Sequence, residues 1–137
     1  MSIAIRDILP DANDPMLGVL SAMSEIIYKV VRTAEWDSAR EAGVFNGSAD
    51  DKRDGFIHLS RAAQLRTTLA RHFVGGDGLL LVSLDVDRFG PELRWEPSRG
   101  GEYFPHLYGP LKLALVHCVV PIHRDGDGRP ILPPDIP

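Results

Sequence analysis

The chain has 137 residues, of which 44% are hydrophobic and 25% charged, as expected for one compact globular domain. Its formal net charge of −4 argues against nucleic acid or a membrane surface as a partner, because both favour a basic face. The single cysteine, Cys118, excludes an internal disulfide, and no apolar run approaches the roughly 18 residues of a membrane span. We expect a cytoplasmic protein in which Cys118 is a small buried apolar residue.

The composition divides the chain into three parts. Residues 1–24 are rich in Asp, Pro and small residues and are predicted to be an N-terminal extension, with Met1 or Met23 as the native start. Residues 25–123 carry the apolar patterns of a single folded domain. The segment 124–137 is rich in glycine and proline and is predicted to be a loose C-terminal tail.

The first half of the domain contains two strand-and-helix units. Ile26–Val31 is a largely apolar run that predicts a strand. Thr33 is placed to cap a helix that ends at Gly43. Asn46–Asp54, with the sequence NGSADDKRD, is polar and is predicted to be a loop. The short strand Gly55–Ser60 follows, and its last residue is the expected N-cap of a second helix.

The second half is predicted to be mainly strands. In Leu79–Asp87 every second residue from Leu80 to Val86 is apolar, which is typical of a strand with one buried face. Leu93–Glu96 is a short strand, and the run 113–121 is the last strong one. The order β-α-β-α-β-β-β predicts a single α+β domain with two helices and a mixed, mostly antiparallel sheet.

Two short stretches combine a histidine with aromatic residues. GFIHLS places His58 on a strand, and GGEYFPHLYGPLK holds His106 and Tyr108 between two prolines. A preorganised segment suits a site wall, because chemistry needs fixed geometry. We expect His106 to be exposed there, so that replacing it changes stability by only about 0.5 kcal/mol. Ser60 combines helix capping with a place where an anion could bind.

A carboxylate and two arginines follow in the stretch LRWEPSRGG. Arg94 and Arg99 flank Glu96 and suit either ion pairing or phosphate binding. His58, Glu96 and His106 are also the residue types of a two-histidine, one-carboxylate metal site. The sequence has none of the close histidine spacings typical of such sites, so we expect no metal. The histidines at positions 72, 117 and 123 are assigned structural roles.

Three of these stretches together suggest a family. DGFIHLS, LRWEPSRGG and FPHLYGPL follow in this order after the opening IYKV and a tryptophan. In this combination they resemble domain-of-unknown-function family 952, a group of small bacterial proteins, over residues 26–121. The resemblance implies an ADP-ribosyltransferase-like fold with a split, strongly bent sheet. It also implies a cleft between two small sheets that binds NAD as a substrate.

The same resemblance suggests roles for individual residues. His58 matches a strand histidine that bonds the adenosine ribose and the nicotinamide amide of NAD, and Ser60 matches a hydroxyl residue two positions later. Tyr108 is the residue type that stacks on nicotinamide. Glu96 is the type that bonds the ribose beside the breaking glycosidic bond. The last strand contains no acid, which departs from the superfamily's usual pattern.

The resulting prediction is a protein that binds NAD or a related nucleotide. It is expected to act as, or descend from, an ADP-ribosyl or glycosidic-bond transferase, with His58, Glu96 and His106 as catalytic residues. Arg94 and Arg99 are expected to help bind the nucleotide, since a related branch uses arginines and NAD to remove a 2′-phosphate from RNA.

Two other functions stay open. The triplets His58-Leu59-Ser60 and His106-Leu107-Tyr108 suit a two-histidine phosphoesterase, in which each imidazole acts as acid or base. The same pocket suits a non-catalytic module that binds a small molecule or a protein segment. Two imidazoles that face each other across one phosphate would favour the phosphoesterase. An aromatic-walled slot beside His58 would favour NAD.

Overall fold

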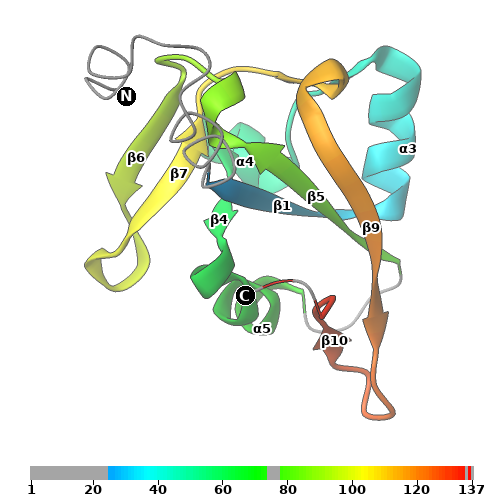
Figure 1. Ribbon diagram of the computed structural model, residues 1–137. Helices are drawn as coiled ribbons and strands as arrows, with labels where there is room; N and C mark the ends of the chain where they lie inside the picture. Colours follow the sequence, from blue (N-terminus) through cyan, green and yellow to red (C-terminus); the bar gives the residue numbers. More distant parts are fainter. Residues whose placement is uncertain (1–24, 74–77, 135, 137) are drawn as a thin grey trace, which may run out of the picture.

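The computed structural model describes residues 25–73, 78–134 and 136 (Figure 1). The predicted extension, residues 1–24, lies outside them. The strands are β1 (Ile26–Arg32), β2 (Val44–Phe45), β3 (Ile57–His58), β4 (Ser60–Arg61), β5 (Leu79–Asp85), β6 (Leu93–Pro97), β7 (Tyr103–Leu107), β8 (Leu111–Lys112), β9 (Val116–Arg124) and β10 (Pro130–Ile131). The α-helices are α3 (Thr33–Ala42), α4 (Ala49–Asp54) and α5 (Leu65–His72).

The strands form one main sheet and two small ones. The main sheet has the order β10-β9-β5-β1-β4, and the small sheets have the orders β2-β8 and β3-β7-β6. Every pairing is antiparallel. The protein is therefore a small α+β domain with a curled antiparallel sheet and few helices, as the sequence predicts.

Strands β1 and β5 separate two apolar cores. Ile27 and Val31 of β1 belong to the core that contains Trp36 of α3, whereas Tyr28 and Val30 face Leu65 and Leu69 of α5. Figure 1 shows the corresponding arrangement, with α3 and α5 on opposite sides of the sheet. Because both faces of β1 are covered, its sequence is a largely apolar run rather than a strict alternation.

The short helix α4 is a departure from the predicted loop. Ser48 caps it, because its Oγ accepts a hydrogen bond from the Asp51 backbone N–H, while the Asp51 carboxylate accepts one from Ser48 N–H. Such a reciprocal capping box satisfies backbone donors that would otherwise lack partners at the helix start. Gly55 ends the helix with a φ of 88°, a conformation that glycine adopts without strain. The helix count is therefore three among the described residues, where the sequence predicts two.

Ser60 is not the helix cap that the sequence predicts. It lies in β4 opposite Tyr28, and its Oγ is 3.0 Å from Thr68 Oγ1 of α5. A 3₁₀ turn, Ala62–Gln64, precedes the α-helix, and the Gln64 side chain accepts the hydrogen bond from Arg61 N–H. The Gln64 side chain thus closes the start of the 3₁₀ turn at Arg61, and α5 itself begins without a side-chain cap hydrogen bond.

Strand β7 occupies the proline-flanked stretch for which the sequence predicts a preorganised segment but no strand. It lies between β3 and β6, although Pro105 has no N–H to give to a ladder. The Pro105 carbonyl accepts a hydrogen bond from Leu59 N–H, just beyond the two-residue strand β3. Since the nitrogen and carbonyl of a strand residue point to the same side, the missing donor faces the place where β3 has ended. A proline is tolerated in this central strand for that reason.

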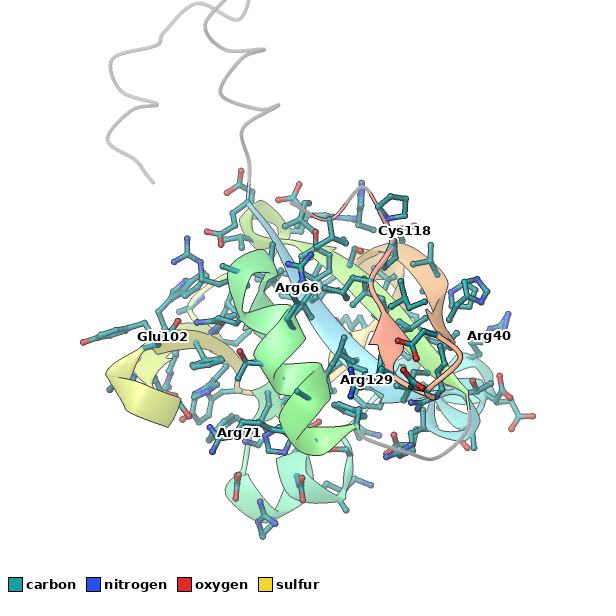
Figure 2. All side chains as sticks on the ribbon, turned by 90° about the horizontal axis from the view of Figure 1, so that it is seen from below. Arg40, Arg66, Arg71, Glu102, Cys118 and Arg129 are labelled. Atoms are coloured by element: carbon teal, nitrogen blue, oxygen red, sulfur yellow. The ribbon has the colours of Figure 1, made fainter. Side chains whose placement is uncertain are left out.

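The C-terminal part of the domain differs from expectation in two places. Cys118 is exposed rather than buried and lies in a part of β9, residues 117–119, in which every side chain is exposed (Figure 2). The segment expected to be a loose tail contains β10, and Leu132 and Ile136 beyond it pack against the core beneath α5. Among the described residues no helix combines the length and the apolar character needed to span a membrane.

Candidate functional site

His58 and His106 lie side by side in the small sheet β3-β7-β6. They are register partners across β3 and β7, and their ring centroids are 5.8 Å apart. Phe56 packs against both, at 4.5 Å from the His58 ring and 4.0 Å from the His106 ring. The two motifs GFIHLS and FPHLYGP therefore meet through one aromatic cluster.

His106 is held by a carboxylate through one of its nitrogens. Its Nδ1 is 2.9 Å from Glu96 Oε1, and the Tyr108 hydroxyl donates to the same oxygen at 2.7 Å. The Arg94 guanidinium lies 4.4 Å from the centre of the Tyr108 ring. Glu96, on β6, thus orients His106 of β7 together with Tyr108, the residue that directly follows β7. The second imidazole nitrogen, Nε2, forms no hydrogen bond with any residue that the structure describes.

The charges of this cluster are coupled. Hydrogen bonds from His106 and Tyr108 hold the pKa of Glu96 below its ordinary value, because both stabilise the carboxylate. The hydrogen bond from Tyr108 to Glu96 also raises the pKa of Tyr108, because it stabilises the protonated hydroxyl, and a phenolate beside a carboxylate is unfavourable. Glu96 is therefore an anion at neutral pH, and it fixes the proton of His106 on Nδ1 and leaves Nε2 as the acceptor of the neutral ring.

His106 is buried, with only 5% of its surface exposed, and the expectation of an exposed wall is wrong on this point. The side chain is covered by Phe56 on one side and by the ladder partners of β7 around it. Its position in the middle strand of a small sheet explains the burial, which the flanking prolines in the sequence do not indicate.

His58 is held by carboxylates at both nitrogens. Its Nδ1 is 2.6 Å from Asp51 Oδ1, and its Nε2 is 2.9 Å from Asp54 Oδ2. Each contact is a hydrogen bond only when the ring nitrogen concerned carries a proton. Both acids come from α4, the helix that the sequence analysis misses.

Asp51 is the centre of a buried network. It accepts hydrogen bonds from His58 N–H at 3.1 Å and from Ser48 N–H at 2.9 Å, and Lys29 Nζ lies 3.0 Å from its Oδ2. Burial by itself would raise the pKa of Asp51, but His58, Lys29 and the two backbone amides together lower it well below its usual range. Gly47, at a φ of 111°, passes so close that a Cβ there would be 2.8 Å from Asp51 Cβ.

A cavity of about 420 Å³ opens beside the two histidines. Such a volume falls within the range of about 300–1,000 Å³ common for small-molecule sites. Of the predicted site residues, His58, Ser60 and His106 line it. The aromatic part of the lining consists of Tyr28, Phe73 and Phe104, and the charged part comes mainly from α4 and α5.

The other predicted residues lie behind the cavity wall. Glu96 and Tyr108 do not line it and reach it only through His106. Arg94 stacks on Tyr108 and is likewise outside the lining. The side chain of Arg99 is outside the described part of the chain. Within that part, no three histidine, cysteine or acidic side chains are grouped as a metal site.

Sequence reasoning misses several residues that shape the site. Lys29, Asp51 and Asp54 line the cavity, as does Arg71 of α5. One signal could have revealed α4, because Ser48 and Asp51 have the S-x-x-D spacing of a capping box. No comparable signal marks Lys29, a charged residue within an apolar strand whose partner is 22 residues away.

The family described as "Protein of unknown function (DUF952)" matches residues 30–119, which include both histidine motifs. The chain belongs to this family. It is also similar to protein CC0527 from Caulobacter crescentus. The crystal structure of that protein is 45% identical, has a TM-score of 0.75 and covers 77% of this chain and 93% of its own. Its solution NMR structure is 46% identical, with a TM-score of 0.70 and coverages of 77% and 90%. None of the curated proteins compared with the chain matches it.

Proposed function

We propose that this DUF952 protein is a small-molecule enzyme that binds a nucleotide in the cavity, with NAD as the first candidate and His106 as the acting base. One observation carries this proposal. His106 is buried and anchored by Glu96 through Nδ1, and its Nε2 has no partner in the described part of the chain, beside a ligand-sized cavity. A buried nitrogen without a partner is costly unless a ligand or water binds it.

The carboxylate–histidine pair has the geometry of a general base. Glu96 fixes the tautomer and would stabilise the imidazolium that forms when Nε2 takes a proton. In a transferase reaction on NAD, the bond between ribose C1′ and the nicotinamide nitrogen breaks, and its electron pair leaves with nicotinamide. An acceptor hydroxyl or water forms the new bond to C1′, and its proton passes to His106 Nε2. Glu96 then acts through His106 rather than on the ribose.

The walls of the cavity support an aromatic, nucleotide-like ligand. Phe104 and Phe73 offer apolar surface for a base or nicotinamide ring, next to hydroxyl and charged groups. His58, with both nitrogens occupied by Asp51 and Asp54, is assigned to shaping this wall. The two-histidine phosphoesterase is less well supported, because it needs an unoccupied nitrogen on each histidine.

Ligand titration tests the proposal. NAD, ADP-ribose and AMP are added separately to the full chain, while thermal stability and binding heat are measured. We expect at least one of them to raise the melting temperature by mass action. His106→Ala should abolish that shift, whereas His117→Ala, a change at an exposed histidine of β9, should keep it.

Enzymatic turnover is a separate readout. Nicotinamide release from NAD, followed by chromatography, should occur with the parent chain and be lost in His106→Ala. Binding without release would support the non-catalytic module instead. The absence of any binding by all three compounds would overturn the proposal.

A further inference from the structure

The cations that line the cavity differ in how they are neutralised. Lys29 is paired with Asp51, at 3.0 Å. Arg53 on α4 is paired with Asp50 at 3.1 Å and with Asp54 at 3.0 Å. The acids of the α4 wall therefore already have cationic partners, and these two cations have little charge left for a ligand.

Arg71 is the exception. It lines the same cavity from the last turn of α5, and no carboxylate of the described residues lies within ion-pair distance of its guanidinium. Figure 2 shows Arg71 at the end of α5 that is nearer α4, whereas Arg66 lies toward the other end. An arginine whose charge is not compensated beside a cavity is well suited to an anionic ligand, because guanidinium binds phosphate through paired hydrogen bonds.

Hydroxyl groups lie on the same wall. Thr68 is three residues before Arg71, so the two side chains share one face of α5. Ser60 Oγ is 3.0 Å from Thr68 Oγ1, and Ser60 is 95% buried at the cavity lining, since only 5% of its surface is exposed. A hydroxyl and a guanidinium on adjacent elements form a donor set that matches phosphate oxygens.

We propose that Arg71 and Ser60 form the anion-binding subsite of the cavity and bind a phosphate group of the ligand. This inference rests on the proposed function, because it concerns the same cavity and gives the ligand its orientation. The phosphate lies against α5 and β4, and the reacting part lies toward His106 on β7. The ligand class is thus a phosphorylated nucleoside or dinucleotide, and an unphosphorylated nucleoside is a poor ligand.

Arginine substitutions on α5 test this subsite. The affinities of the full chain for ADP-ribose, inorganic pyrophosphate and adenosine are measured by calorimetry at two salt concentrations. Arg71→Ala should weaken ADP-ribose and pyrophosphate binding about ten- to a hundredfold, because a hydrogen bond to a charged group is lost. The same variant should leave the affinity for adenosine unchanged. The affinities for ADP-ribose and pyrophosphate should become less dependent on salt concentration. Arg66→Ala, at an exposed position on the same helix outside this cavity, is the matched control.

The outcomes separate this inference from the proposed function. If Arg71→Ala binds ADP-ribose as well as the parent does, the subsite is overturned while nucleotide binding stands. If the parent binds pyrophosphate through Arg71 but not NAD or ADP-ribose, the subsite stands and the NAD proposal fails. If the parent binds none of the phosphate compounds, both are overturned.

Discussion

The domain contains two carboxylate–histidine pairs, and they differ in how completely their polar atoms are hydrogen-bonded. Asp51–His58 is surrounded by partners, since the aspartate also binds Lys29 and two backbone amides and His58 reaches a second acid. In Glu96–His106 the carboxylate has two donors, and the histidine keeps Nε2 unpaired within the described part of the chain.

This difference suggests that one pair has a structural role and the other a functional role. The rings are 5.8 Å apart and contact the same phenylalanine, so distance from the cavity does not distinguish them. Their hydrogen bonds do. A fully bonded pair stabilises the fold, because every polar group in it is compensated. A pair with one available nitrogen can bind or move a proton.

The largest expected effect comes from breaking the Asp51 network. Asp51→Ala would leave Lys29 buried without its counter-charge, which should lower the free energy of unfolding by about 3–5 kcal/mol. Urea denaturation of the parent and the variant measures this. Asp50→Ala, at the exposed neighbouring acid, should change it by no more than about 0.5 kcal/mol. Equal losses in both variants would contradict the structural role of Asp51.

Lowering the pH should cause part of the same loss in the free energy of unfolding. Folding lowers the pKa of Asp51 below its ordinary value of 3.8, because His58, Lys29 and backbone amides stabilise the anion. Its contribution to stability is therefore complete well above the pKa of the unfolded chain and is lost as the pH falls from about 3.8 toward the lowered pKa of the folded chain. Denaturation midpoints between pH 6 and pH 2.5 should show this decline, and Asp51→Asn should flatten it. An unchanged slope in Asp51→Asn would assign the acid sensitivity to other carboxylates.

His106→Ala should have a smaller effect on stability and a complete effect on function. The change removes a buried ring that packs on Phe56, and we expect a loss of about 1–3 kcal/mol. His106→Gln keeps a polar side chain of similar length and should recover part of that stability, but it should not restore nicotinamide release. Denaturation and turnover assays are made on the same preparations. A His106→Gln variant with parental turnover would refute the base role.

The smallest expected effect belongs to Tyr108→Phe. It keeps the ring that contacts Phe56 and Arg94 and removes the hydroxyl donor to Glu96. The pKa of Glu96 should rise toward its ordinary value of 4.5 but stay below it, because His106 still donates. Carbon-detected NMR titration measures the shift, and unfolding should change no more than for ordinary surface substitutions. A pKa that does not move would show that the tyrosine bond contributes little in solution.

The sequence predicts the domain's long elements well, because they carry strong apolar periodicity. Residues Leu80, Val82, Leu84 and Val86 share one face and all contact the core beneath α3. The antiparallel α+β class follows from the same patterns. Short elements are harder to predict, since two-residue strands such as β2 and β8 have no period at all.

The candidate site is predictable where a residue is unusual and not where it depends on a distant partner. His58 and His106 stand out in their motifs, and the structure places them together. Asp51 is one of several acids in a polar stretch, and its contacts with Lys29 of β1 and His58 of β3, which only the folded chain brings together, distinguish it. Pro105 marks the segment as rigid but misleads on its conformation, because a strand tolerates it where the neighbouring strand has ended.

The pairing of His58 with His106 also constrains how the length of the chain can vary during evolution. Side chains alternate between the faces of β7, so one residue inserted within the strand would turn His106 toward the side of Pro105 and away from Glu96. The turn that joins β6 to β7, closed by Ser98 and Glu102, lies outside the residues that pair and can change length without altering that register. Insertions in descendants of this chain that keep the site should therefore collect in this turn, while the residue count within each strand stays fixed.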